Sequence, residues 1–306
     1  MLHLESIADV RAACDRARRE GRTVGLVPTM GFLHAGHRSL MRAAAAATDF
    51  VVVTIFVNPL QFGANEDLDR YPRDLAGDLE GCAAEGVACV FTPSVAEMYP
   101  RPARTTVHVD GLTADLCGAA RPTHFDGVTT VVAKLFAITG PCRAFFGRKD
   151  AQQLAVVTRM AADLDLPVEV VGCPIVREAD GVAMSSRNAY LGAEDREAAR
   201  VLSHALRRAV DAIVGGERDA SRVARLVRET VGVEPRVDLE YAEIRDAHEL
   251  TPMTTLSGSV LVALAARVGT TRLIDNVLLQ VDGTHVSADL GVADLNGSGG
   301  SPCSAR

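Results

Sequence analysis

The sequence has no long apolar run, no paired cysteine motif and very little lysine. No apolar stretch approaches the roughly 18 residues that a membrane-spanning helix needs. Acidic residues stand among the first ten, so we expect neither a membrane span nor a secretory leader. The seven cysteines are scattered, odd in number and never spaced as CxxC, which is typical of a reducing compartment without disulfides or structural zinc. We therefore expect a cytoplasmic protein.

Charge and composition exclude further classes. The net charge of -7 is spread along the chain without a long basic run, which argues against nucleic acid as the main partner. With 48% hydrophobic and 23% charged residues among 306, the chain has the composition of an ordinary globular protein. Its length suits one large domain or two smaller ones.

The first part of the chain alternates between strand and helix patterns. Ser6 and Asp9 form a capping-box arrangement before a helix, and the apolar run 50–57 is typical of a strand inside a parallel sheet. The alternation predicts a Rossmann-like, doubly wound α/β domain over residues 1–177. The expected strands are 23–28, 50–57, 87–91, 144–147 and 168–172, and the expected helices are 6–20, 36–48, 74–85, 126–139 and 150–163.

The pattern changes near Ala193. Two helical patterns, 193–214 and 219–230, precede three strand patterns, and this order predicts a second, smaller α+β domain over residues 178–291. The expected strands are 236–246, 259–268 and 271–281. Residues 292–306 have a Gly/Ser-rich end and no apolar periodicity, so we expect a disordered tail.

The segment PTMGFLHAGH, residues 28–37, joins an expected strand to an expected helix. Ligands of open parallel sheets bind beyond the carboxyl ends of strands, where the N-H groups of the next helix face them. His34 and His37 at the helix start can present donors to one side, which favours phosphate. The alternative is that both merely form a turn and cap the helix. Zinc is disfavoured, because HxGH has neither the glutamate of HExxH nor a third ligand nearby.

Lysine is rare enough to be informative, because only two of the 32 basic residues are lysines. Lys149, in FFGRKDAQQL, follows an expected strand, so its compact ammonium would reach the same crevice; the alternative is an exposed salt bridge. Lys134 lies in the apolar helix segment VVAKLF, and we expect it to extend its ammonium from a core face. Ser185, Ser186 and Arg187 follow the first domain's last strand, and two hydroxyls beside a guanidinium suit a polyphosphate.

Five motifs together resemble pantothenate synthetase, the ligase that joins pantoate to β-alanine. They are PTMGFLHAGH, IFVNPLQFG, EDLDRYPR, FGRKDAQQL and MSSRNAYL, within a resemblance that runs from about residue 20 to residue 280. HAGH corresponds to the HIGH-type signature of the nucleotidylyltransferase superfamily. The resemblance implies that ATP and pantoate form pantoyl adenylate and pyrophosphate, after which β-alanine displaces AMP. It also implies magnesium as a cofactor and a homodimer.

The resemblance further implies roles for individual residues. The residues that hold the triphosphate, and which we also expect to be catalytic, would be His34, His37, Lys149, Ser185, Ser186 and Arg187. The other residues at the nucleotide would be Met30, Gly31, Gly147, Asp150, Val176 and Met184. Pantoate would be held by Gln61, Gln153 and Asn58, because neutral amides bind a carboxylate without lowering its nucleophilicity as a cation would. Asp78 would help to position magnesium.

Three positions depart from the family's usual pattern. Arg148 stands where glutamate is usual, and Ala151 stands where an aromatic residue is usual. Gly77 stands where an acid often precedes Asp78, which leaves the magnesium site with one fewer carboxylate. One carboxylate can suffice, because magnesium commonly keeps phosphate and water ligands.

Two other functions stay open on the sequence alone. The first is a nucleotidylyltransferase that keeps AMP or CMP in its product; Gln61 and Gln153, which suit an unphosphorylated acid, argue against it. The second is a nucleotide-binding regulator without turnover. The intact Lys149 and both histidines argue against that function.

Overall fold

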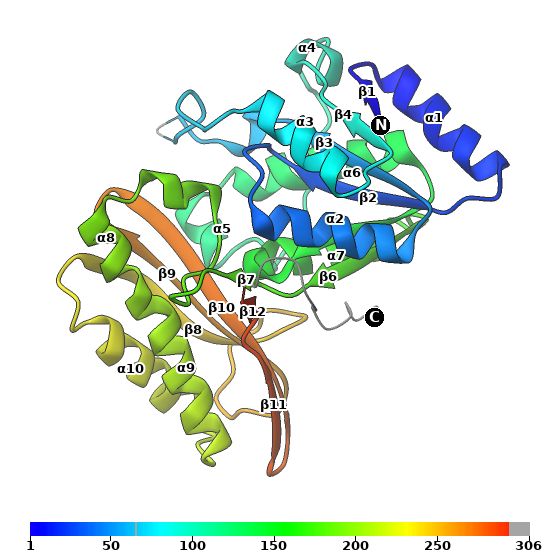
Figure 1. The fold of residues 1–306 in the computed structure, drawn as a ribbon. Helices are drawn as coiled ribbons and strands as arrows, with labels where there is room; N and C mark the ends of the chain where they lie inside the picture. Colours follow the sequence, from blue (N-terminus) through cyan, green and yellow to red (C-terminus); the bar gives the residue numbers. More distant parts are fainter. Residues whose placement is uncertain (65, 294–306) are drawn as a thin grey trace. The chain divides into compact units, whose positions relative to one another are not determined.

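The computed structural model describes residues 1–64 and 66–293, which form two compact units (Figure 1). The first unit comprises Met1–Gly147 and Val156–Cys173. The second comprises Arg148–Ala155 and the described residues from Pro174 onward. The contacts thus place the short segment that carries Lys149 and Gln153 with the C-terminal unit, whereas the sequence suggested a single boundary at residue 177.

The first unit is built on a six-stranded parallel sheet with the strand order β1-β4-β3-β2-β5-β6. The strands are β1 (Leu2–Leu4), β2 (Val24–Thr29), β3 (Phe50–Ile55), β4 (Cys89–Phe91), β5 (Cys142–Gly147) and β6 (Val168–Cys173). The first five residues of β3 are buried, as the apolar run predicted. The chain winds outward in both directions from the β2/β5 pair, so this pair is the switch point, where such sheets bind ligands. The predicted doubly wound fold is confirmed.

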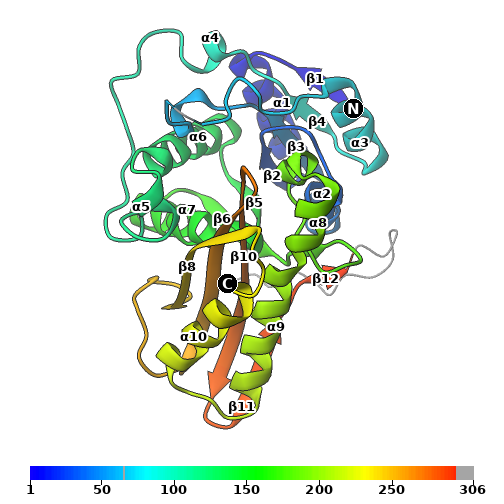
Figure 2. The same ribbon diagram turned by 90° about the vertical axis from the view of Figure 1, so that its left-hand side faces the viewer.

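Helices cover both faces of this sheet (Figure 2). One face carries α2 (Ala35–Ala47) and α3 (Leu75–Ala84), and the other carries α1 (Ile7–Arg19) and α6 (His124–Thr139). The apolar side of α2 packs on the sheet, and this part of the core includes Leu40, Met41, Ala44, Val27, Val53 and Phe145. Ser6 caps α1 as predicted, because its hydroxyl oxygen accepts the N-H of Asp9 at 3.1 Å. The shorter elements η1 (Pro59–Gln61), α4 (Val95–Met98) and α5 (Cys117–Ala120) had no clear sequence signal.

The second unit contains a four-stranded antiparallel sheet with the order β11-β10-β9-β8. Its strands are β8 (Val237–Asp246), β9 (Gly258–Val268), β10 (Thr271–Asp282) and β11 (His285–Asp289). Its helices are α8 (Ala193–Ala198), α9 (Arg200–Val214) and α10 (Ala220–Val231), so the expected helix 193–214 is interrupted at Ala199. Helices α9 and α10 pack on the sheet through a shared apolar core that includes Leu206, Ile213, Val227, Leu264 and Val277. The predicted smaller α+β domain is confirmed.

Two residues of the expected tail lie in a strand. β12 (Val292–Ala293) pairs in parallel with β7 (Val176–Arg177), and the N-H of Val292 donates to the carbonyl of Ile175 at 2.7 Å. A two-residue strand is too short to show periodicity, which explains why the sequence did not reveal it. The remainder of the expected tail, 294–306, lies outside the described residues.

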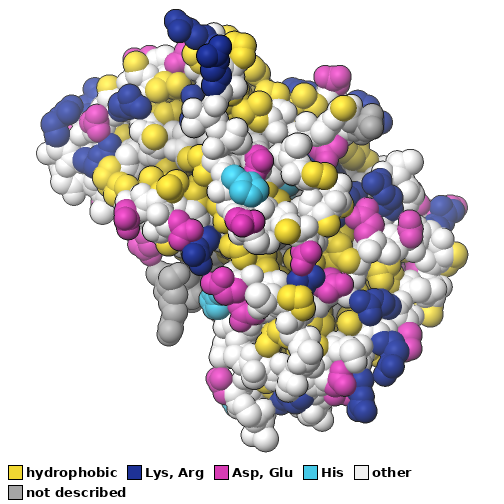
Figure 3. Space-filling model, turned by 180° about the vertical axis from the view of Figure 1, so that it is seen from behind, with side chains coloured by type: hydrophobic (Ala, Val, Ile, Leu, Met, Phe, Trp, Pro, Cys, Tyr) yellow, Lys and Arg dark blue, Asp and Glu magenta, His cyan; other side chains and the backbone are white. Residues whose placement is uncertain are grey.

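The distribution of surface charge and the state of the cysteines agree with the expectations from the composition. Basic and acidic side chains are interspersed over the face of the molecule in Figure 3. The six cysteines in the described part of the chain are buried and take no part in a disulfide. Among residues 1–64 and 66–293, no helix combines the length and the apolar character that crossing a membrane requires.

Candidate active site

His34 and His37 form the start of α2. Nδ1 of His34 accepts the N-H of Gly36 at 3.2 Å, and Nδ1 of His37 accepts the N-H of His34 at 3.3 Å. The two half-buried imidazole rings lie 4.1 Å apart, measured between their centroids. The helix cap that the sequence left as an alternative role is therefore present.

The cap also determines which ring nitrogen carries the proton. A nitrogen that accepts a hydrogen bond has no proton, so each neutral imidazole carries its proton on Nε2. Nε2 of His34 and of His37 is thus a donor, at a helix N-terminus whose dipole favours an anion. Capping the helix and binding phosphate use different atoms of the same rings, so the two roles are compatible.

Asp78 of α3 holds the loop that leads into this cap. Its Oδ2 accepts the N-H of Phe32 at 2.8 Å, and its Oδ1 accepts the N-H of Leu33 at 2.7 Å. Phe32 has a φ of 53°, a left-handed backbone conformation that is costly for a bulky residue. Gly31 precedes it with a φ of 85°, and a Cβ there would lie 2.9 Å from Asp78 Oδ2. Asp78 therefore stabilises a strained turn that Gly31 makes possible.

These contacts bear on the predicted magnesium site. Asp78 is only 3% exposed, and burial raises the pKa of its carboxyl group although both backbone N-H groups oppose that shift. No group of three or more His, Cys, Asp or Glu side chains in the described residues has the arrangement of a metal site. The role of Asp78 toward magnesium stays a prediction, and its observed contacts are those of a loop anchor.

The nearby departure at Gly77 lies beside the cap of α3. Asp74 caps α3, because its Oδ1 accepts the N-H of Gly77 at 3.1 Å. A Cβ at Gly77 would collide with Oδ2 of the same carboxylate. A larger residue at position 77 would therefore require the Asp74 carboxylate to shift.

Two of the three amides expected at pantoate, Asn58 and Gln61, lie together in the first unit, whereas Gln153 belongs to the second. Nδ2 of Asn58 donates to Oε1 of Gln61 at 3.2 Å, and Nε2 of Gln61 donates to Sδ of Met30 at 3.1 Å. Tyr99 adds a hydrogen bond that sequence reasoning missed, because its hydroxyl donates to Oδ1 of Asn58 at 2.9 Å. Burial raises the pKa of Tyr99 to about 12, so the phenol stays protonated and keeps this donor. The ammonium of Lys134 lies 5.5 Å from the centre of the Tyr99 ring, a cation-π contact.

Lys149 and Ser185 line one pocket of the second unit. Other residues of its lining are Val182, Ala183, Leu273, Ile274 and Asp275. Nζ of Lys149 is 3.9 Å from Oδ1 of Asp150, a separation at the outer limit of an ion pair, and the lysine side chain is 20% exposed. The salt bridge that the sequence left as an alternative role of Lys149 is therefore present only as a long contact with Asp150. Ser185 begins η3 (Ser186–Tyr190), and its hydroxyl oxygen accepts the N-H of Arg187 at 3.3 Å.

The predicted site residues as a whole are divided between the two units. The first unit contains Met30, Gly31, His34, His37, Asn58, Gln61, Asp78 and Gly147. The second contains Lys149, Asp150, Gln153, Val176, Met184, Ser185, Ser186 and Arg187. Within the second unit, the N-H of Met184 donates to the carbonyl of Val176 at 2.9 Å, and Gln153 is half-buried in the first turn of α7 (Ala151–Asp163).

Arg148, the second departure from the family pattern, has a partner of its own. Its Nη1 donates to Oδ2 of Asp289 at 2.6 Å in a partly buried ion pair. The side chain of Arg148 is therefore engaged in an ion pair with a strand of its own unit. Ala151, the third departure, is half-buried at the first position of α7.

Comparison with known proteins adds the family. A model of the pantoate-β-alanine ligase family matches residues 3–278. The chain belongs to the pantoate-β-alanine ligase family. Pantothenate synthetase of Heliobacterium modesticaldum is 56% identical over 278 residues, which are 91% of this chain and 99% of the relative. The enzyme of the same name from Pelotomaculum thermopropionicum is 53% identical over 279 residues, with the same coverage of both chains.

Solved structures of this ligase family share the fold. Pantothenate synthetase from Thermus thermophilus has a TM-score of 0.86 and 45% identity, covering 90% of this chain and 98% of that one. Pantoate-β-alanine ligase from Francisella tularensis, complexed with beta-gamma ATP and β-alanine, has a TM-score of 0.74 and 30% identity, covering 90% and 97%. The resemblance inferred from five motifs is confirmed, and the chain is a ligase of pantothenate biosynthesis.

Proposed function

We propose that this ligase condenses pantoate with β-alanine through a pantoyl adenylate, with ATP as the co-substrate. The observation that carries the proposal is the capped pair His34 and His37 at the carboxyl end of β2, in a chain that matches the ligase family over residues 3–278. The pair presents two Nε2 donors at a helix N-terminus, which suits a polyphosphate. Magnesium enters with ATP, as the metal of the nucleotide substrate.

In the first step an oxygen of the pantoate carboxylate attacks the α-phosphorus of ATP. The bond from that phosphorus to the bridging oxygen breaks, and pyrophosphate leaves with the electron pair. Pantoate is itself the nucleophile, so the enzyme needs only alignment and relief of charge repulsion. Alignment can be worth an effective molarity of about 10⁵ to 10⁸ M. Each donor aimed at the developing charge can add about 3 to 4 kcal/mol.

We assign those donors to six side chains. They are His34, His37, Lys149, Ser185, Ser186 and Arg187. Met30, Gly31, Gly147, Asp150, Val176 and Met184 are assigned to the rest of the nucleotide. The position of Lys149 and Ser185 in the lining of one pocket supports this grouping within the second unit.

In the second step the amine of β-alanine attacks the acyl carbon. The carbon-oxygen bond to AMP breaks, AMP leaves with the bridging oxygen, and the amine loses a proton to give the amide. Asn58, Gln61 and Gln153 are assigned to pantoate. The mutual hydrogen bond of Asn58 and Gln61, both buried, supports a preformed neutral site.

An isotope experiment tests this route. With ¹⁸O in the pantoate carboxylate, we expect AMP to carry one heavy oxygen and pyrophosphate to carry none. An acyl phosphate route would instead give ADP and labelled inorganic phosphate; the sequence has no GxxxxGK loop for such a transfer. Retention of the nucleotide in the product would identify a nucleotidylyltransferase, and either result would reject the proposal.

We also propose that the enzyme is a cytoplasmic homodimer. The buried cysteines of the described chain, none of which is in a disulfide, support a reducing compartment. The dimer follows from the family resemblance. Light scattering on the purified protein tests the dimer, and a monomeric mass at micromolar concentration would reject it.

A further inference from the structure

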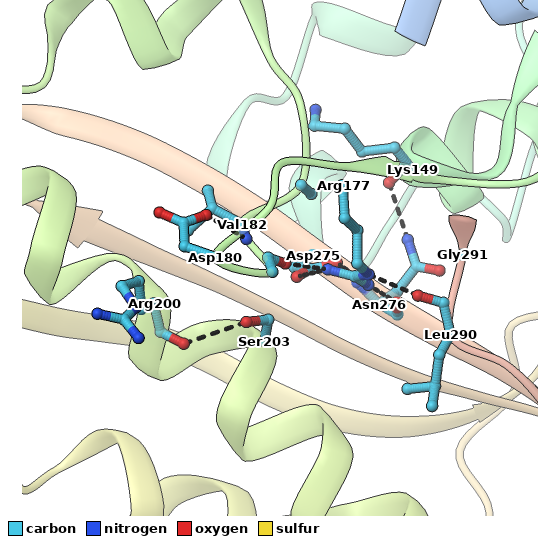
Figure 4. Close-up of polar contacts among 12 residues, drawn as sticks. Lys149, Arg177, Asp180, Val182, Arg200, Ser203, Asp275, Asn276, Leu290 and Gly291 are labelled. Carbon is cyan, nitrogen blue, oxygen red and sulfur yellow. Dashed lines mark hydrogen bonds and ion pairs between the residues drawn. The ribbon is translucent and has the colours of Figure 1, made fainter. Parts of the chain in front are cut away.

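The backbone that carries Lys149 is held by a buried side chain of β10. Nδ2 of Asn276 donates to the carbonyl of Lys149 at 2.8 Å (Figure 4). It also donates to the carbonyl of Arg148 at 3.0 Å. Asn276 is 3% exposed. Only the amino end of the amide can donate to two carbonyls, so these contacts determine the orientation of the side chain.

The neighbouring residue of β10 forms the centre of a buried ion pair. Asp275 accepts two hydrogen bonds from Arg177, at 2.7 Å and 2.9 Å, and the side chains are 3% and 5% exposed respectively. Oδ1 of Asp275 also accepts the N-H of Asn276 at 2.8 Å. A bidentate pair of this kind has a narrow range of geometries, so Asp275 orients the guanidinium strongly.

Arg177 in turn holds the hairpin that leads to Ser185. Its Nη1 donates to the carbonyl of Gly181 at 3.1 Å, across the turn of that hairpin. Arg177 itself pairs with Ala183 in an antiparallel bridge, two residues before Ser185. Beyond the first residues of η3, Nδ2 of Asn188 donates back to the carbonyl of Ala183 at 3.1 Å. The hairpin and η3 are therefore tied together.

We propose that Asp275 and Asn276 are positioning residues that hold the segment of Lys149 and the hairpin of Ser185 in one arrangement. Asn276 fixes the first segment, Asp275 fixes the second through Arg177, and the two are adjacent on one strand of a sheet. Neither residue is assigned to the substrate. The inference rests on the proposed phosphate role of Lys149 and Ser185 and names what keeps these groups aligned.

The coupling can be measured with a double-mutant cycle on the full chain, using Asn276→Ala, Lys149→Ala and the double variant. Pyrophosphate release with ATP, magnesium and pantoate gives kcat and the KM for ATP. We expect Asn276→Ala to lower kcat by about 10- to 100-fold, since a displacement of about 1 Å can cost about 10²-fold, with less change in KM. In the Lys149→Ala background the same substitution should change kcat by less than about twofold, because the effect acts through Lys149.

A matched control separates positioning from a loss of stability. Thr271 lies on the same strand and is also buried, so Thr271→Ala should lower the melting temperature while leaving kcat nearly unchanged. If Asn276→Ala does not fold, Asn276→Ser keeps one donor and should give an intermediate loss that again disappears in the Lys149→Ala background. Equal fold-changes in both backgrounds, or an unchanged kcat, would overturn the inference.

A readout without turnover keeps this inference separate from the proposed function. Amide hydrogen exchange should accelerate over residues 148–150 in the Asn276 variant and stay unchanged over residues 30–37. If the unaltered chain releases no pyrophosphate, the proposed function fails and exchange alone tests the positioning. Unchanged exchange over residues 148–150 would then reject it.

Discussion

The His34 loop and the Lys149 segment carry groups with the same expected task, but they are held at very different ranges along the chain. The histidines are fixed by their own neighbours, because each Nδ1 accepts an N-H two or three residues away. The backbone of Lys149 is fixed by Asn276, which is 127 residues away. The first arrangement is a helix cap, and the second is a tertiary network inside the second unit.

The difference shows how donors can be presented to an anion. A cap orients donors wherever a helix begins, so a short motif is sufficient. A lysine side chain has four rotatable bonds and no such local constraint, so its backbone must be held from elsewhere. Asp78 is intermediate, because it anchors the histidine loop from 45 and 46 residues away. Three sets of substitutions test this contrast, beginning with the one that we expect to change turnover most.

Removing the ammonium of Lys149 should have the largest effect. We expect Lys149→Ala to lower the rate of pyrophosphate release with ATP and pantoate by about 10² to 10³, the usual loss for one transition-state donor. Lys134 offers a matched control, because it is the only other lysine and its ammonium lies over the ring of Tyr99. Lys134→Ala should cost about 0.5 to 1 kcal/mol of stability and little turnover. A near-normal rate in folded Lys149→Ala would show that Lys149 does not act on the phosphates.

Two substitutions at His34 separate capping from donation. Asparagine is among the best N-cap residues, so His34→Asn should keep the cap while withdrawing the Nε2 donor. We expect nearly unchanged stability and a rate of pyrophosphate release lowered by about 10²-fold. His34→Ala should lose the same rate and, in addition, about 1 kcal/mol of unfolding free energy in urea titrations. Full activity in His34→Asn would mean that the ring serves only as a cap.

The anchor of the histidine loop should matter more for stability than for rate. Asp78→Ala leaves the N-H groups of Phe32 and Leu33 unpaired, at about 1 to 3 kcal/mol each. Turnover should fall by about 10-fold, because a loosened loop misaligns both histidines. Asp74→Ala, which removes only the exposed cap of α3, should cost about 1 kcal/mol.

The same pair of variants distinguishes the anchor from the predicted magnesium role. If Asp78→Ala were as stable as Asp74→Ala but needed far more magnesium for half-maximal turnover, Asp78 would act on the metal and the anchor role would be wrong. Urea unfolding and a magnesium titration of the initial rate provide both measurements.

Much of the fold followed from local pattern. The apolar run at β3 predicted a buried parallel strand, and Ser6 with Asp9 predicted the start of α1. The predictions missed what depends on two or three residues only, such as the break at Ala199 and the pairing of Val292 with Val176. Elements this short have too few residues for a period of 2 or 3.6 to be visible.

The sequence by itself determined most of the strands and helices of both parts, the family motifs and the place of His34 and His37 at the start of a helix, because each depends on residues within about one helical turn or one strand. Only the tertiary structure decided that Asn276 holds the backbone of Lys149, that Asp275 pairs with Arg177, and that residues 148–155 belong to the second unit. A hydrogen bond between distant residues forms only when the packing of intervening elements has brought them together, since closing such a long loop costs entropy that local propensity cannot offset. No periodicity in the chain marks the partners of such a bond, so the network that holds Lys149 is visible only in three dimensions.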